Sequence, residues 1–222
     1  MSTGIAERSS DIEHSLLRRQ NQNRVDLADP CPLTLALVSY LWMDLPLLEW
    51  LYPHRRDPSL YPVELLTDLG KSTWYIVVSL ILFIYWIDRK PVWSDAALLV
   101  LSTTIVSGIL VNIVKVIFGR ARPQLYIDEH LYGFFWGKVD VLYRSFPSGH
   151  ATTAIAVWLA FALLFPRYRI GLIAVGILIA LSRVVLSQHY FSDVLIGGWL
   201  GAMTTLILYG MIFSGESDID KR

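Results

Sequence analysis

The sequence predicts an all-α protein, a polytopic membrane helix bundle with about six transmembrane helices. Of its 222 residues, 54% are hydrophobic and only 17% are charged, whereas about a quarter of the residues in a soluble domain are charged. Its apolar runs approach the length of about 20 residues that a helix needs to cross a bilayer. The formal net charge is zero and no basic tract is present, so we expect no nucleic-acid partner.

Six apolar runs support this fold class, and they cover residues 32–52, 72–87, 94–118, 149–165, 170–187 and 191–213. The first run is the weakest, because Asp44 and Glu49 interrupt it. A charge within a membrane helix usually faces the bundle interior or lies near a helix end. We therefore expect a polar cytoplasmic tail at residues 1–31, a transmembrane domain at residues 32–213 and a second cytoplasmic tail at residues 214–222.

Basic residues in the short loops orient the predicted spans. Lys and Arg mark the cytoplasmic side of membrane proteins, and both short turns at residues 88–91 and 166–169 contain them. Six spans would put these two turns and both termini on one side, which we assign to the cytoplasm. The bias is modest, because residues 119–147 on the other side are also partly basic. The compact chain with short loops favours a bacterial inner (plasma) membrane.

Polar residues collect at the ends of the last four predicted spans. They are Lys115 and Arg122 after span three, Ser148, Gly149 and His150 at the start of span four, Arg183 at the end of span five, and His189 and Asp193 at the start of span six. The alternation of spans places all four ends on the extracytoplasmic face. Three cations on one face indicate a site for a multiply charged anion, and phosphate suits the donors of Arg and Lys.

Each local pattern also has an ordinary explanation. Ser148 can cap the helix that follows it, and the N–H groups at a helix start bind anions, but capped helices without ligands are common. His189 and Asp193 are four residues apart. In a helix that began at this point, Asp193 would hold one ring nitrogen of His189 and leave the other free to attack. The alternative is a structural histidine at the membrane surface.

Three motifs together resemble the signatures of the type 2 phosphatidic acid phosphatase (PAP2) family. They are Lys115-x6-Arg122-Pro123, Pro147-Ser148-Gly149-His150 and Ser182-Arg183-x5-His189-x3-Asp193. All three occur in the family's order, no signature residue is missing, and the resemblance extends over about residues 70–213. It implies a membrane-bound phosphoric monoester or lipid diphosphate hydrolase that works through a phosphohistidine intermediate.

The resemblance also implies a role for each motif residue. His189 attacks phosphorus, Asp193 orients its ring, and His150 protonates the leaving group and later activates water. The phosphoryl oxygens are bound by Lys115, Arg122, Ser148, Gly149 and Arg183. We expect no metal and no other cofactor, because the cations supply the charge that Mg²⁺ provides elsewhere and the motifs contain no compact carboxylate cluster. Ser182 is expected to support the loop that carries Arg183.

The substrate stays open among several membrane lipids that carry a phosphate. Phosphatidate, phosphatidylglycerol phosphate, undecaprenyl diphosphate and lipid A are all candidates, and a site on the outer face favours the last two. A lipid phosphotransferase is the main alternative, because it would form the same intermediate. A non-enzymatic lipid transporter fits less well with a complete set of site residues. The expected partners are thus a lipid phosphate and the bilayer, and the oligomeric state stays unknown.

Three further features lie beside the motifs. We interpret Arg120 and Arg144 as solvated arginines near the rim of the site. The loop at residues 124–146 is rich in aromatic side chains, and it is either a belt at the membrane surface or a cover over a cleft through which a headgroup enters. Gly197 and Gly201 form a small-xxx-small pair that predicts close helix packing in the last span.

Overall fold

The computed structural model describes residues 31–213, and most of both predicted tails lies outside the described residues. Within this range the structure contains helices and no strand, apart from one isolated bridge between Arg120 and Phe134. The α-helices are α2 (Cys31–Val38), α3 (Asp44–Leu51), α4 (Tyr61–Asp68), α5 (Ser72–Trp86), α6 (Pro91–Phe118), α7 (Pro123–Glu129), α8 (Gly149–Leu164), α9 (Arg169–Val185) and α10 (Phe191–Phe213). The predicted all-α class is confirmed.

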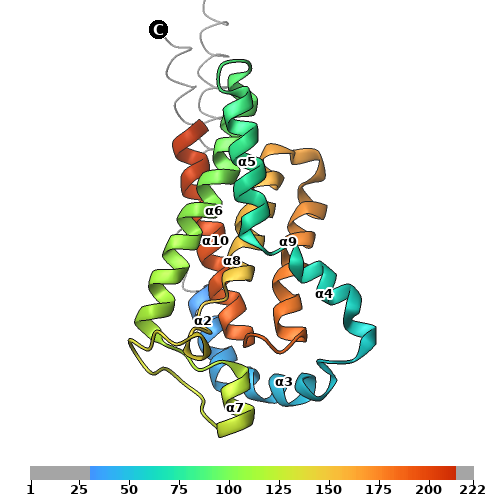
Figure 1. The fold of residues 1–222 in the computed structure, drawn as a ribbon, viewed down its shortest axis with the longest axis vertical. Helices are drawn as coiled ribbons and strands as arrows, with labels where there is room; N and C mark the ends of the chain where they lie inside the picture. The colour runs from blue at the N-terminus through green and yellow to red at the C-terminus, as the bar shows by residue number, and fades with distance from the viewer. Residues whose placement is uncertain (1–30, 214–222) are drawn as a thin grey trace, which may run out of the picture. The chain divides into compact units, whose positions relative to one another are not determined.

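Among the described residues, five helical stretches are long and apolar enough to cross a membrane: Cys31–His54, Pro58–Trp86, Pro91–Phe118, Pro166–Val185 and Phe191–Phe213. They correspond to five of the six expected spans. The first is not straight, because a π-helical turn at Ser39–Met43 separates α2 from α3. In Figure 1, α3 runs across the lower end of the bundle, whereas α6 and α10 run along its length.

The expected span at residues 149–165 corresponds to α8, which is shorter than a full crossing. It has 16 residues, about 24 Å at 1.5 Å per residue, against a hydrocarbon core of about 30 Å. Ser148, which precedes it, is fully buried. The helix α8 therefore begins inside the bundle instead of at its surface.

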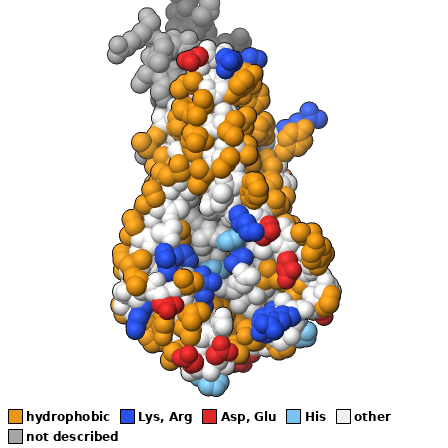
Figure 2. Space-filling view, in the orientation of Figure 1, with side chains coloured by type: hydrophobic (Ala, Val, Ile, Leu, Met, Phe, Trp, Pro, Cys, Tyr) orange, Lys and Arg blue, Asp and Glu red, His pale blue; other side chains and the backbone are white. Residues whose placement is uncertain are grey.

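Helix α8 is central to the bundle and packs against α6, α9 and α10. Most of its buried hydrophobic side chains are alanine: Ala151, Ala154, Ala156, Ala160 and Ala162. Small side chains let neighbouring helices approach closely, which favours packing in a bilayer where the lipid is as apolar as leucine. Large side chains point outward instead, such as Trp74, Ile81 and Ile84 of α5, and hydrophobic side chains cover the upper half of the face shown in Figure 2.

Gly197 and Gly201 allow α10 to pack directly on α8. A Cβ at Gly197 would lie 2.6 Å from the Ser148 carbonyl oxygen, and one at Gly201 would overlap the Thr152 carbonyl oxygen. One turn later, the Thr205 hydroxyl donates to the carbonyl of α8 at Ala156, at 3.0 Å. The close packing predicted from the small-xxx-small pair is confirmed.

Substituting leucine for Gly201 is expected to force α8 and α10 apart. Overpacking a tight contact costs about 1–3 kcal/mol, so the melting temperature of the detergent-solubilised protein should fall clearly. Gly210→Leu is the matched control, because Gly210 is also in α10 but has open space around its Cβ position. Thermal unfolding followed by size-exclusion chromatography measures both variants, and equal melting temperatures would contradict the packing argument.

Candidate active site

The predicted site residues come together at the end of the bundle where α6 stops and α8 and α10 start. Lys115 is in the last turn of α6, Gly149 and His150 are in the first turn of α8, Arg183 is near the end of α9, Asp193 is in the first turn of α10, and Arg122, Ser148 and His189 are in the connecting segments. Figure 2 shows Lys, Arg and His side chains around a hollow in the lower half of this face. The structure therefore brings the three motifs to one place.

The end of α6 separates Lys115 from Arg122. Gly119 adopts a left-handed conformation with φ of 54° and its N–H bonds to the Lys115 carbonyl, which ends the helix. Arg122 is then extended, with φ of −75° and ψ of 158°, as expected for a residue before Pro123. The Lys115 ammonium donates to the Arg144 carbonyl at 2.8 Å. The two cations thus approach the site from different segments.

Ser148 is the N-cap of α8, as predicted. Its hydroxyl accepts the Ala151 N–H at 3.5 Å, and its own N–H donates to the Asp193 carbonyl at 3.0 Å. Gly149 faces Lys115, since a Cβ at Gly149 would lie 3.8 Å from the lysine Cε. The free N–H groups of the first turn of α8 and the lysine ammonium can therefore bind the same anion.

His189 lies beside Asp193, although α10 begins two residues after the histidine. The two residues therefore do not share a helical face. The Asp193 carboxylate instead reaches back to accept the Tyr190 N–H at 3.1 Å, and its Oδ2 lies 3.5 Å from His189 Nδ1. Burial lowers the pKa of His189 to about 3, although the contact with Asp193 acts in the opposite direction. The ring is therefore neutral at physiological pH, which a nucleophile requires.

Ser145 contacts both His189 and Asp193. The sequence did not predict it as a site residue. Its hydroxyl donates to Asp193 Oδ2 at 2.6 Å and lies 3.5 Å from His189 Nδ1. Its only sequence signal is a position just before the motif that contains Ser148. Ser145 fixes the same carboxylate oxygen that faces the histidine.

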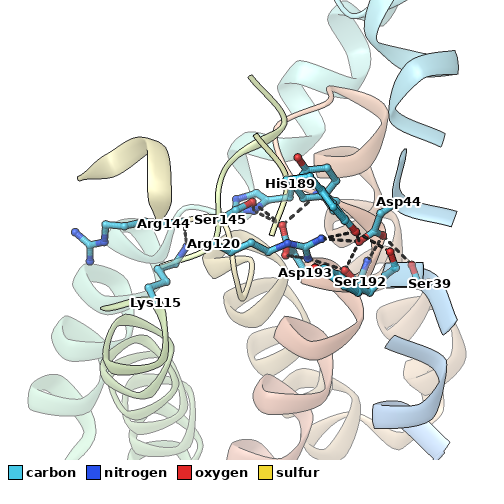
Figure 3. A network of polar contacts seen from close by, with 12 residues as sticks. Ser39, Asp44, Lys115, Arg120, Arg144, Ser145, His189, Ser192 and Asp193 are labelled. Carbon is cyan, nitrogen blue, oxygen red and sulfur yellow. Dashed lines mark hydrogen bonds and ion pairs between the residues drawn. The ribbon is translucent and has the colours of Figure 1, made fainter. Parts of the chain in front are cut away.

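The prediction that Arg120 is a solvated rim residue is wrong. Its side chain is fully buried between Asp44 and Asp193, with Nη2 2.7 Å from Asp44 Oδ2 and Nη1 2.5 Å from Asp193 Oδ1. Figure 3 shows the guanidinium between the two carboxylates. Burial alone would lower the pKa of Arg120, but Asp193 and Asp44 raise it above its ordinary value. The arginine therefore stays charged.

Aromatic rings enclose the Arg120 guanidinium. Its Cζ lies between 4.3 Å and 5.4 Å from the centroids of four rings: those of Tyr40, Tyr132, Phe134 and Tyr190. Two of them, Tyr132 and Phe134, come from the aromatic loop that the sequence analysis assigned to a surface belt or a cleft cover. These two rings instead keep water away from a buried charge, whereas Trp136 of the same loop is 64% exposed.

The end of α4 and the turn that joins it to α5 form a further wall of the site. Arg183 donates from Nη1 to the Thr67 hydroxyl at 3.0 Å, and a Cβ at Gly70 would lie 3.1 Å from His150 Cδ2. Sequence reasoning assigned no role to this turn. Ser182 donates to the Ile179 carbonyl at 2.6 Å, which is a bond within α9.

Several of the other carboxylates and histidines lie at the protein surface. Asp128, Glu129, Asp140, His54 and His130 are exposed, and His14 lies outside the described residues. Among residues 31–213, no group of three or more His, Cys, Asp or Glu side chains is arranged to hold a metal ion. The charged groups around His189 are thus cations and one carboxylate.

Comparison with known proteins identifies the class of protein. The solved structure of a transmembrane PAP2-type phosphatidylglycerolphosphate phosphatase from Bacillus subtilis has the same fold, with a TM-score of 0.53 and 21% identity over 91% of this chain and 94% of that one. The model of the PAP2 superfamily matches residues 96–215. The chain belongs to the PAP2 superfamily.

Several curated relatives of this chain are named as lipid phosphatases. Lipid A 1-phosphatases from Rhizobium etli and Rhizobium johnstonii are 39% and 37% identical to this chain over 173 residues, covering 70% of it and 75% and 71% of their own lengths. Undecaprenyl-diphosphatase BcrC from Bacillus subtilis is 29% identical over 147 residues, covering 65% of this chain and 69% of its own length.

Proposed function

We propose that this chain is an integral membrane phosphatase that releases phosphate from a lipid through a phosphohistidine intermediate. The observation that carries the proposal is a buried, neutral His189 whose Nδ1 faces Asp193 at the end of the bundle where the cations gather. Membership of the PAP2 superfamily and the named lipid phosphatases among its relatives support the same reaction.

The reaction has two steps in this proposal. In the first, His189 Nε2 attacks phosphorus, an N–P bond forms as the P–O bond to the lipid breaks, and His150 gives a proton to the departing oxygen. Asp193 stabilises the ring that has become positive. In the second step, water attacks the phosphorus of the phosphohistidine, a P–O bond forms as the N–P bond breaks, and His150 takes the proton from the water. Inorganic phosphate then leaves and His189 is restored.

The surrounding groups bind the phosphoryl oxygens. Positive charge comes from three side chains: Lys115, Arg122 and Arg183. The Gly149 N–H at the start of α8 and Ser148 add hydrogen bonds to the same oxygens. Donors held in place before the reaction stabilise the charge of the transition state at no reorganisation cost. In this scheme no metal ion and no cofactor is needed.

Lipid A phosphates are the first substrates to test. The relatives at 39% and 37% identity are named lipid A 1-phosphatases, and the undecaprenyl-diphosphatase is less similar, at 29%. We place the site on the extracytoplasmic face of a bacterial inner membrane. The basic turns at residues 88–91 and 166–169, which join α5 to α6 and α8 to α9, support this orientation by the positive-inside rule.

A groove beside the site fits the apolar part of a lipid. A pocket of about 290 Å³ is lined by Lys115, Gly149 and His150. A second pocket of about 770 Å³ shares Ser72, Gly108 and Asn112 with the first one and continues between α5 and α6. Isoleucines line this second part, namely Ile76, Ile105, Ile109, Ile113 and Ile117. One end of the groove thus suits a phosphate and the other an acyl chain.

Filling the groove at Gly108 is expected to discriminate against long lipids. No atom lies within 4 Å of a Cβ placed there, so Gly108→Phe should fold normally and occupy the apolar part. We expect kcat/KM for a long-chain lipid phosphate to fall about tenfold, and activity on a water-soluble phosphate ester to fall much less, because Gly108 also borders the phosphate end of the groove. Gly210→Phe, in equally open space on α10, should retain both activities. An equal loss on both substrates would show that the groove does not hold the acyl chain.

The test of the proposed function is phosphate release by the purified protein in detergent. The substrates are lipid A, undecaprenyl diphosphate, phosphatidate and phosphatidylglycerol phosphate, each with and without EDTA. We expect release from at least one lipid, unaffected by EDTA. Activity lost in EDTA and restored by Mg²⁺ would overturn metal independence. Phosphate that moves to a second lipid without appearing in solution would identify a phosphotransferase.

A further inference from the structure

Asp44 reaches the candidate active site from a helix outside residues 96–215, the segment that the family model matches. Its side chain is fully buried. It accepts hydrogen bonds from the Ser39 hydroxyl at 2.9 Å, from the Ser192 N–H at 2.9 Å and from Arg120 at 2.7 Å. The Ser192 hydroxyl also donates to it, as does that of Tyr132 at 3.3 Å. Both oxygens of the Asp44 carboxylate therefore have hydrogen-bond donors.

The first consequence is that Asp44 caps α10 from another element. Ser192 is in the first turn of α10, where backbone N–H groups have no partner within the helix. Asp44 supplies the acceptor, and its negative charge is favourable at a helix N-terminus. The carboxylate therefore fixes the start of α10, and with it Asp193, relative to α3.

The second consequence comes from the fork of the Arg120 guanidinium. One nitrogen holds Asp44 and the other holds Oδ1 of Asp193. Oδ2 of Asp193 is then left for the Ser145 hydroxyl, the Tyr190 N–H and the ring of His189. Figure 3 shows this chain of contacts running from Ser39 to His189. Each oxygen of Asp193 thus has its own set of partners.

We propose that Asp44 and Arg120 are positioning residues, which hold the Asp193 carboxylate so that one oxygen faces His189. The inference rests on the proposed phosphohistidine chemistry, and neither residue touches the substrate. The charge balance adds a second effect. Two carboxylates share one guanidinium, which leaves one negative charge to stabilise the histidine ring when it becomes positive. Without the charge of Asp44, the positive charge of Arg120 would be balanced by Asp193 only. No net negative charge would then be left to stabilise the histidine ring.

Asp44→Asn tests the proposal, because the amide keeps the size of the side chain and an acceptor for the Ser192 N–H. We expect kcat to fall about 10- to 100-fold, as for a misplaced catalytic group, with KM within about twofold of wild type. Rapid-quench labelling should show slower formation of the phosphoenzyme. Glu49→Gln is the matched control, because Glu49 lies on the same helix, is exposed and bonds only the Tyr126 hydroxyl among its described contacts. It should match wild type.

If Asp44→Asn does not fold, a second variant tests the same positioning role. Tyr132→Phe removes a hydroxyl that contacts both Asp44 and Arg120 and keeps the ring, so kcat should fall severalfold with KM unchanged. A wild-type kcat in every folded variant would overturn the positioning role. So would a lower melting temperature with unchanged kcat, which identifies a purely structural ion pair. A wild-type protein that never forms a phosphoenzyme overturns the proposed function and this inference together.

Discussion

His189→Ala is expected to abolish phosphate release, with kcat reduced at least about a thousandfold. The variant lacks the atom that forms the N–P bond, and water would have to attack the lipid phosphate directly. The fold should persist, because the described contacts of the ring with Asp193 and Ser145 are both 3.5 Å long and contribute little to stability. The variant should therefore lose activity without a matching loss of melting temperature.

Covalent labelling makes this prediction specific for the nucleophile. Wild-type protein incubated briefly with a ³²P-labelled lipid should carry label on a histidine, and such a phosphoramidate bond is stable in alkali and broken by acid. His189→Ala should carry none. His54→Ala, which changes an exposed histidine, should label like wild type. Label retained in His189→Ala would assign the intermediate to another residue.

Asp193→Asn is expected to lose both activity and stability. Four residues contact this carboxylate: Arg120, Ser145 and Tyr190 donate hydrogen bonds to it, and the ring of His189 lies beside it. An amide offers one acceptor oxygen, so whichever way it turns, its NH₂ group points at a donor. Removing one partner of a buried ion pair costs up to about 3–5 kcal/mol, and Asp193→Asn leaves Arg120 with Asp44 as its one remaining carboxylate partner among the described residues. Removal of the aspartate that orients a catalytic histidine lowers kcat by about 10⁴-fold in serine proteases, and a loss of similar size is expected.

The two losses are measured on the same preparation. Phosphate release and thermal unfolding of Asp193→Asn should both fall, whereas those of Asp140→Asn, a change at an exposed carboxylate, should equal those of wild type. Asp193→Asn with full activity would show that the histidine needs no carboxylate partner. Lost activity with an unchanged melting temperature would show that Arg120 finds another partner.

Local signals explain which parts of the site could be predicted. Ser148 is followed by a helix, so its capping role is readable from the chain itself. Pro123 likewise forces Arg122 into an extended conformation. Arg120 carries no such signal: it is two residues from Arg122, and its partner Asp44 is distant in the sequence. The sequence showed that Asp44 interrupts an apolar run and should face the bundle interior or lie near a helix end, but only the folded chain reveals the arginine that it contacts.

The depth at which α8 begins in the bundle could not be predicted from the sequence either. Hydropathy counts apolar residues, and the run at residues 149–165 is as apolar as its neighbours. Whether such a run begins at the membrane surface or below it depends on how far α6 and α10 extend past it. The bend between α2 and α3 was missed for a related reason, because the residues of Ser39–Met43 continue the apolar run without a proline or glycine.

The contact of Gly197 with α8 bears on where the substrate preference of this enzyme can change. Gly197 lies against the Ser148 carbonyl, and the Ser148 N–H donates to the Asp193 carbonyl. The start of α8, which we propose binds the phosphoryl oxygens, and the start of α10, which carries Asp193, are therefore joined through their backbones, with no flexible side chain between them. Their spacing is set once, when the chain folds, and every catalytic cycle reuses it. New substrate preferences are then more readily acquired along the groove of α5 and α6 than at this junction.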